Sequence, residues 1–265
     1  MAKLAYVVIK CGGSILHQLP DAFFENLVQI KARFGLEPVI VHGGGPAISA
    51  MLEKMQIETQ FKNGLRVTTE PVLNVVEMVL SGSINKWITR RLSQAGAKAV
   101  GISGTDSRLL TARKIETPNL GYVGEIESVN EQVLHALLRQ QFIPVISPVA
   151  TDKNGQRLNV NADLAAAAVA RKMNARVWMV TDVPGVMMEG KVLPYLTPGQ
   201  VDGLIQKQVI TGGMIPKVRA AAECIRSGVK EVVIVDGTEE DSLLFLAGGG
   251  KTGTKFTGNG VLIDG

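Results

Sequence analysis

Six short, almost continuously apolar runs constrain the fold of this chain more than any other feature; they are YVVIK, PVIVH, AVGIS, IPVIS, VWMVT and EVVIVD. Strands that are covered on both faces show runs of this kind, whereas strands with one wet face alternate. Helical patterns separate the runs, at residues 21–35, 46–55, 70–80, 83–96, 130–141, 162–173 and 214–228. The repetition of strand and helix predicts an α/β fold in which helices cover both faces of a mostly parallel sheet.

Composition excludes several classes of function. The 265 residues are 46% hydrophobic and 20% charged, as in an ordinary globular protein, and their net charge is +4. No run of five Lys or Arg occurs, and only three Tyr and two Trp could stack on bases, so we expect no nucleic-acid partner. The apolar run LAYVVI is too short for a signal peptide, and no stretch reaches the length of a membrane span. A cytoplasmic protein with no membrane partner is expected, with Cys11 and Cys224 as buried thiols.

The segment GGGKTGT, residues 248–254, is similar to a phosphate-binding loop but does not have its spacing. The loop requires a glycine five positions before Gly250, and Phe245 occupies that position. It also requires a following helix, whereas KFTGNGVLIDG is typical of a closing strand. We therefore predict a tight entrance to the last strand, and phosphate binding by Lys251 is the alternative.

The remaining inventory of reactive groups favours phosphoryl transfer. The chain contains no HExxH motif and no GxSxG motif, and its three histidines are scattered, which argues against metal hydrolases and serine hydrolases. Lysines, glycine-rich turns and a few acids are left. Phosphoryl transfer uses such groups, because the protein mainly positions the reactants and neutralises their charge.

Glycine clusters follow the first two predicted strands. Lys10 ends the first strand and is followed by Gly12 and Gly13, while Gly44 and Gly45 come after the second strand and open a helix. In a parallel sheet, ligands bind beyond the carboxyl ends of the strands. Unhindered backbone amides at the positive end of a helix dipole suit an anion, so we predict anion binding at this edge.

Three later segments add polar groups at the same predicted edge. In NVNAD, Asn159 and Asn161 can donate hydrogen bonds from one face, and Asp163 either stabilises the following helix or acts in the site. TDVPG leaves its strand without a helix and so has room for a flat ring. Lys217 lies in the first turn of a helix, where the helix dipole disfavours a cation, so an anionic group should compensate it.

Hairpins interrupt the strand and helix rhythm in three places. FKNGLRVT turns at Asn63-Gly64, residues 109–129 form a second β excursion, and GVMMEGKVLPYL turns at Glu189-Gly190. Such hairpins serve either as walls over a site or as plain surface ribbons, and the sequence leaves both possibilities open.

Taken in order, the segments VIKCGGS, VIVHGGGP, KNGLRVT, NVNAD, TDVPG and TGGMIPK resemble the amino acid kinase family over almost the whole chain. The resemblance implies a single domain, a three-layer α/β/α sandwich around an open, mostly parallel eight-stranded sheet. It assigns the amino-acid substrate to the half of about residues 1–175 and ATP to the half of about residues 176–265. The segments are most similar to members that transfer the γ-phosphoryl group of ATP to the side-chain carboxylate of N-acetyl-L-glutamate in arginine biosynthesis.

The same resemblance assigns roles to individual residues. Lys10 and Lys217 would stabilise the transferring phosphoryl group, and Asp163 would orient both lysines. Four glycines would supply backbone donors: Gly12, Gly13, Gly44 and Gly45. Arg66 would clamp the α-carboxylate of the substrate, with Asn159 and Asn161 as further substrate contacts. The wall around adenine and ribose would consist of Asp182, Val183, Pro184, Gly185, Val186, Met187, Val209, Ile210 and Thr211. Mg²⁺ would arrive with ATP, without a metal site of the protein's own.

Two alternatives stay open at this point. A kinase for aminoadipate, either N-acetylated or attached to a carrier protein, would differ mainly in the length of its acceptor. A non-catalytic sensor of amino acids or nucleotides could share the fold. The resemblance also implies a homodimer, and one insensitive to arginine, because inhibited members carry an extra N-terminal helix and only MAK precedes the first strand here.

Overall fold

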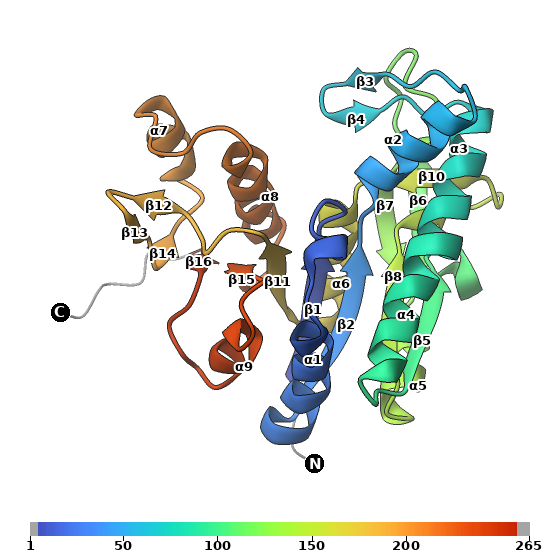
Figure 1. Ribbon diagram of the computed structural model, residues 1–265. Helices are drawn as coiled ribbons and strands as arrows, with labels where there is room; N and C mark the ends of the chain where they lie inside the picture. Colours follow the sequence, from blue (N-terminus) through green and yellow to red (C-terminus); the bar gives the residue numbers. More distant parts are fainter. Residues whose placement is uncertain (1–4, 259–265) are drawn as a thin grey trace.

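The computed structural model describes residues 5–258, and an eight-stranded sheet is its central feature (Figure 1). The strands are β1 (Ala5–Cys11), β2 (Leu36–His42), β5 (Ala99–Ser103), β8 (Ile143–Ser147), β11 (Arg176–Thr181), β14 (Tyr195–Leu196), β15 (Glu231–Asp236) and β16 (Thr254–Thr257). Their order is β14-β16-β15-β11-β1-β2-β8-β5. All neighbours are parallel except β15 and β16. The predicted, mostly parallel sheet is confirmed, and each of the six apolar runs forms one of its strands.

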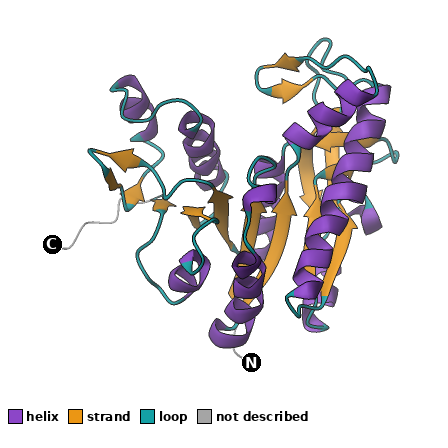
Figure 2. Cartoon of the chain, in the orientation of Figure 1, coloured by secondary structure: helices purple, strands orange, loops and turns teal. Residues whose placement is uncertain are grey.

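Helices cover the two faces of this sheet, and each face has its own apolar core. On one face lie α1 (Asp21–Phe34), α2 (Gly45–Lys54), α3 (Glu70–Glu77), α4 (Asn85–Gln94) and α9 (Ser242–Ala247). The other face carries α5 (Glu131–Arg139), α6 (Ala162–Met173), α7 (Val201–Gln206) and α8 (Met214–Arg226). Two short 3₁₀ helices, η1 (Leu16–Gln18) and η3 (Asp106–Arg108), lie in loops. The expected three-layer sandwich is confirmed (Figure 2).

One smaller expectation is also met. Cys11 and Cys224 are buried free thiols. None of the helices within residues 5–258 is long and apolar enough to cross a membrane.

The helix over residues 70–94 differs from the prediction of two separate helices. Helix α3 continues through a π-helical segment, η2 (Met78–Ile84), directly into α4. The predicted helices at residues 70–80 and 83–96 left Ser81 and Gly82 between them, but these two residues keep helical geometry in a turn that holds one extra residue. The wide turn keeps Val79, Leu80 and Ile84 in the core.

A second, four-stranded sheet closes on itself as a small barrel beside α6. It contains β6 (Leu110–Lys114), β7 (Val123–Val129), β9 (Val149–Thr151) and β10 (Arg157–Val160). The sequence predicted β6 and β7 as a β excursion, and these two strands are antiparallel. It did not predict β9, or that residues 157–160 pair with both β9 and β7.

Both of the two-residue turns that were predicted from sequence form hairpins. β3 (Phe61–Lys62) and β4 (Leu65–Arg66) are joined by Asn63 and Gly64, both with positive φ, as a type I′ turn requires. β12 (Met187–Met188) and β13 (Lys191–Val192) are joined in the same way. The two hairpins project at opposite sides of the molecule (Figure 1). GGGKTGT leads into β16 as predicted, although residues 259–265 of the predicted last strand lie outside the described residues.

The alanine run of α6 lets this helix pack closely against its neighbours. Ala165, Ala166 and Ala170 are fully buried, and the helix contacts β1, β7 and α8. Side chains without a γ carbon leave little distance between the helix backbone and the sheets. A larger residue here has no space, because protein interiors are close-packed.

We therefore expect Ala166→Leu to lower the free energy of unfolding by about 1–3 kcal/mol, through overpacking. Leu164→Ala, on the exposed side of the same helix, is the control and should change it by about 0.5 kcal/mol or less. Urea denaturation of the two variants measures both values, and equal stabilities would contradict this account of the alanine run.

Candidate active site

A cleft of about 220 Å³ lies at the carboxyl ends of β1 and β2 and is lined by many of the residues singled out in the sequence. The predicted residues that line it are Lys10, Gly13, Gly44, Gly45, Arg66, Asn159, Asn161 and Asp163. Segments far apart in the chain therefore meet at one place, beneath the β3–β4 hairpin, which contributes Phe61 and Leu65 to the lining. Gly12 is not part of the lining, and neither is Lys217 nor any residue of the predicted nucleotide wall.

Lys10 and Asp163 form an ion pair at one end of the cleft. Nζ of Lys10 lies 2.8 Å from Oδ1 of Asp163, and the two side chains are only 16% and 26% exposed. Lys10 comes from the end of β1, and Asp163 from the first turn of α6. The positive end of the helix dipole stabilises the carboxylate as well, so one of the three ammonium donors is bound to Asp163 and the others are left for a ligand.

Asn161 is the N-cap of α6, a role that the sequence analysis did not assign to it. Its Oδ1 accepts hydrogen bonds from the backbone amides of Asp163 at 2.8 Å and of Leu164 at 3.2 Å. The cap leaves the amide group of Asn161 as the donor toward the cleft, and it fixes the start of the helix that carries Asp163.

Arg66 is a buried cation with only neutral partners. Its side chain donates to Oγ1 of Thr59 at 2.7 Å, to Oγ of Ser49 at 2.8 Å and to the carbonyl of Gly45 at 3.0 Å. It lies over the ring of Phe61 and is 7% exposed, and this burial lowers its pKa. Within residues 5–258 it has no carboxylate partner at ion-pair distance. A buried guanidinium without an anion is costly, and one that lines a cleft is suited to a carboxylate ligand.

The two glycine turns touch each other. A Cβ atom added to Gly13 would lie 2.7 Å from both Cα and N of Gly44, so only glycine allows this approach. Leu80 and Ile84 press on Gly44 from its other side. Among the described residues, the amides of Gly13, Gly44 and Gly45 donate to no acceptor. They form a set of free donors next to Lys10, at the start of α2.

The opposite wall of the cleft is strand β10, which carries Asn159. Nδ2 of Asn159 donates to Oγ1 of Thr68 at 3.1 Å, and Thr68 donates to the carbonyl of Arg66 at 2.8 Å. The predicted substrate contacts Asn159 and Arg66 are thus joined through a buried threonine that sequence reasoning missed. A lone Thr in KNGLRVT carries no local signal of this role.

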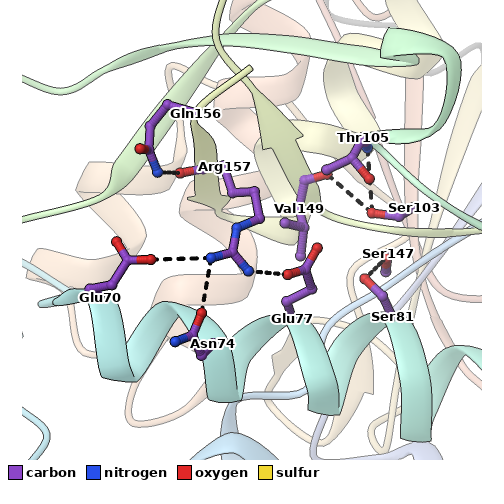
Figure 3. Close-up of polar contacts among 10 residues, drawn as sticks. All are labelled: Glu70, Asn74, Glu77, Ser81, Ser103, Thr105, Ser147, Val149, Gln156 and Arg157. Atoms are coloured by element: carbon purple, nitrogen blue, oxygen red, sulfur yellow. Dashed lines mark hydrogen bonds and ion pairs between the residues drawn. The ribbon is translucent and has the colours of Figure 1, made fainter. Parts of the chain in front are cut away.

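Arg157 fixes the same strand to helix α3, as Figure 3 shows. Its guanidinium bonds to the carboxylate of Glu77, to Oε1 of Glu70 at 3.2 Å and to Oδ1 of Asn74 at 2.9 Å. Glu70, Asn74 and Glu77 lie on one face of the helix because they are three and four residues apart. This network attaches the wall that carries Asn159 to a long helix.

Lys217 pairs with Asp182 and not with Asp163, which differs from the role expected for Asp163. Its Nζ lies 2.8 Å from Oδ1 of Asp182 and also donates to Oγ1 of Thr181. The hydrogen bond from Lys217 is the main reason why the pKa of Asp182 is lowered. Lys217 is the fourth residue of α8, so Asp182 is an anionic group that compensates a cation in the first turn.

The predicted nucleotide wall is mixed in its exposure. Val186 and Ile210 are buried in the core, so they could offer only their backbone to a ligand. Asp182, Pro184, Met187 and Thr211 are exposed. Pro184 lines a separate cavity of about 390 Å³ together with Tyr195, Lys251 and Gly253. Within residues 5–258, no group of three or more His, Cys, Asp or Glu side chains could hold a metal ion. The assignments of the nucleotide wall and of Mg²⁺ to ATP stay predictions.

The family of this chain follows from comparison with known proteins. The sequence profile of the amino acid kinase family matches residues 5–236, and the chain belongs to this family. It is similar to an acetylglutamate kinase of Brevibacillus brevis, at 51% identity over 91% of this chain and 93% of that protein. It is 47% identical to an acetylglutamate kinase of Bacillus subtilis, over 87% of this chain and 90% of that one.

Solved structures agree with the fold. The protein smu.665 of Streptococcus mutans UA159 has a TM-score of 0.82 and 34% identity, covering 96% of this chain and 99% of its own. An N-acetylglutamate synthase of Neisseria gonorrhoeae has a TM-score of 0.80, covering 98% of this chain and 61% of its own; at 20% identity, it shows the fold alone.

The contact between the two glycine turns predicts a large difference between neighbouring substitutions. Gly13→Ala forces a Cβ atom against the backbone of Gly44, and no side-chain rotation relieves this clash, so we expect a loss of about 1–3 kcal/mol in the free energy of unfolding. A Cβ atom on Gly12 would meet its nearest neighbours at 3.9 Å. Gly12→Ala is therefore the control, with an expected change of about 0.5 kcal/mol or less. Equal urea midpoints for the two variants would refute the contact.

Proposed function

We propose that this protein transfers the γ-phosphoryl group of ATP to the side-chain carboxylate of N-acetyl-L-glutamate, forming an acyl phosphate for arginine biosynthesis. One observation carries the proposal: the buried Arg66, without an anionic partner, lines the same cleft as Lys10 and the free amides of Gly13 and Gly44. The cleft thus offers two groups of donors for negative charge, the guanidinium of Arg66 and the set formed by Lys10 and the glycine amides. The acetylglutamate kinases that are 51% and 47% identical to this chain support the same reaction and substrate.

The chemistry needs no general base. The nucleophile is a carboxylate, which is ionised at neutral pH. Arg66 binds the α-carboxylate of the acceptor, with Asn159 and Asn161 as donors beside it. The difficulty is that two anions must meet in line, and Lys10 and the glycine amides offset their repulsion. One such donor contributes about 3 kcal/mol to the stability of a transition state.

Lys217 acts on the nucleotide side in this proposal. It exchanges the carboxylate of Asp182 for the phosphates of MgATP, while Asp163 keeps Lys10 aimed at the cleft. The exposed position of the Lys217 and Asp182 pair, with side chains 33% and 44% exposed, makes this exchange accessible to a ligand. The nucleotide base and ribose lie along residues 182–187 and 209–211, where Val186 and Ile210 contribute backbone only.

The proposal includes a homodimer in the cytoplasm. The alternatives from sequence, an aminoadipate kinase and a non-catalytic sensor, are not favoured. Acetylglutamate kinases match most of the chain, and Lys10, Asp163 and Lys217 are all present.

Trapping of the acyl phosphate with hydroxylamine tests the reaction directly. With MgATP, we expect hydroxamate from N-acetyl-L-glutamate and little from glutamate or N-acetyl-aminoadipate. A Lys217→Ala preparation, purified in the same way, controls for contaminating kinases and should lose about 99% of the signal. Hydroxamate from the longer acid instead would identify an aminoadipate kinase, and no product from any acceptor would refute the proposal.

Arg66→Lys tests the carboxylate clamp. Lysine keeps the charge but loses the planar fork, so the KM for N-acetyl-L-glutamate should rise by about 10-fold to 100-fold. The KM for ATP should stay within about threefold of the wild-type value. Lys62→Arg is the matched control, because Lys62 lies on the same hairpin outside the cleft lining and bonds to the carbonyl of Pro118. Equal changes in the two KM values would argue against the clamp.

A further inference from the structure

His42 is a buried histidine that the proposed chemistry does not use. It ends β2, directly before the glycine turn that begins at Gly43, and it is 0% exposed. Its Nδ1 lies 3.1 Å from the carbonyl oxygen of Gly43, and its Nε2 lies 3.3 Å from Nδ2 of Asn85. Both ring nitrogens thus have partners, and one of the partners is the backbone of the turn.

These partners determine which nitrogen carries the proton. A carbonyl oxygen only accepts, so Nδ1 of His42 is the donor, and Nε2 is left as an acceptor for the side-chain amide of Asn85. Three more contacts orient that amide: Nδ2 of Asn85 donates to the carbonyls of Val145 at 2.9 Å and Ile102 at 3.2 Å, while its Oδ1 accepts from Lys86 at 3.2 Å. The two hydrogens on Nδ2 are therefore shared among three acceptors, of which Nε2 of His42 is one. Burial lowers the pKa of His42 to about 4, so its imidazole is neutral at physiological pH.

The hydrogen bond from His42 sets the direction of the next peptide group. In a trans peptide, the carbonyl of Gly43 and the N–H of Gly44 point in opposite directions. Because the carbonyl of Gly43 points to the buried imidazole, the N–H of Gly44 points away from it. Gly43 and Gly44 both line the cleft, and the amide of Gly44 donates to no acceptor among residues 5–258.

Asn85 reaches His42 because of the π-helical segment. The segment ends at Ile84, and Asn85 follows directly, fully buried against His42 at the end of β2 and Val145 in the middle of β8. Gly101 of β5 lies against Asn85, and a Cβ atom there would overlap its side chain. Leu80 and Ile84, from the same wide turn, press on Gly44. π segments within α-helices are frequent at functional sites, and this one contacts the glycine turn twice.

We propose that His42 and Asn85 are positioning residues for phosphoryl transfer: Asn85 holds the ring of His42, and His42 turns the Gly43–Gly44 peptide so that the amide of Gly44 faces the reacting anions. This role rests on the proposed function. His42 does not touch the substrate, and it moves no proton.

Two isosteric substitutions separate the two hydrogen bonds. In His42→Asn, the side-chain nitrogen occupies the place of Nδ1 and can still donate to Gly43, but the contact with Asn85 is lost. In His42→Gln, the side-chain amide reaches the position of Nε2 and keeps the contact with Asn85, but no donor remains for the carbonyl of Gly43. Each variant loses one buried hydrogen bond, so their melting temperatures should fall by similar amounts.

The positioning role predicts that the two variants differ in turnover. We expect kcat of His42→Gln to be lower than that of His42→Asn by about tenfold or more, because the amide of Gly44 stabilises charge in the transition state. The KM values for ATP and for the acceptor should stay within about threefold. Equal kcat values, or kcat losses that follow the melting temperatures, would show a merely structural role.

A measurement on a protein that keeps His42 covers the case in which neither His42 variant folds. In a His17→Gln, His135→Gln double variant, His42 is the only histidine left. Nitrogen-15 NMR of its ring should show the Nδ1–H tautomer, unchanged from about pH 8 to about pH 5. An Nε2–H tautomer, or titration near the ordinary pKa of 6.5, would overturn the proposal.

The two proposals can fail separately. The kcat ratio is measured with whichever carboxylate acceptor the wild-type protein uses, so a different acceptor refutes the substrate and leaves the positioning role testable. Wild-type turnover with equal kcat values in the two variants refutes the positioning role alone. Absence of turnover with every acceptor refutes both.

Discussion

The contact between the backbone turns at Gly13 and Gly44 is the constraint on which the rest of the site depends. It brings the ends of β1 and β2 together more closely than any side chain would allow. Lys10 precedes one turn and α2 follows the other, so the ammonium group and the start of the helix are fixed in relation to each other. The Cβ atom of Ala162 lies close to Gly43, and this contact places the start of α6 and its Asp163 beside the same turns. Backbone packing alone therefore positions the glycine amides and the start of α2 for binding an anion.

The cations of the site differ in how their charge is balanced, and the difference agrees with their proposed roles. Lys10 and Lys217 each have a carboxylate partner, Asp163 and Asp182, so their charge is compensated without ligand. Arg66 is more deeply buried and has three neutral acceptors instead. A buried charge in this state gains more from an incoming carboxylate than a paired lysine does, because no existing ion pair is broken. Among the cations of the site, Arg66 therefore gains the most from binding an anionic ligand.

The sheet and much of the substrate cleft could be predicted from sequence, because their signals are local. Apolar runs predict buried strands, and glycine clusters after them predict the functional edge, so Lys10, Gly13, Gly44 and Asp163 were found together. The contacts that sequence reasoning missed are long-range. Neither Thr68 nor Asn85 belongs to a recognisable sequence motif. They contact the site only because Asn159 of β10 and His42 of β2 lie next to them in the fold. The prediction of two helices, with Ser81 and Gly82 between them, was wrong, because tertiary packing keeps these residues in a wide helical turn. The ion pair between Lys217 and Asp182 is also long-range, and no local signal in the sequence shows it.

The long helix over residues 70–94 connects the walls of the cleft and gives a physical basis for discrimination by acceptor length. At one end, α3 holds β10 through Arg157 and Glu77; farther along, Asn85 holds the glycine turn through His42. Arg66 is itself bound to Gly45 of that turn. The distance between the proposed clamp for the α-carboxylate and the proposed donors for the phosphoryl group is therefore set by one packed unit of backbone and buried side chains. If these proposed roles hold, an acceptor with one more methylene group would have to bend or shift its reacting carboxylate, because Arg66 and the glycine turn are bound to each other at Gly45. Because in-line transfer depends on that alignment, the proposal implies that the added carbon would lower turnover more than binding.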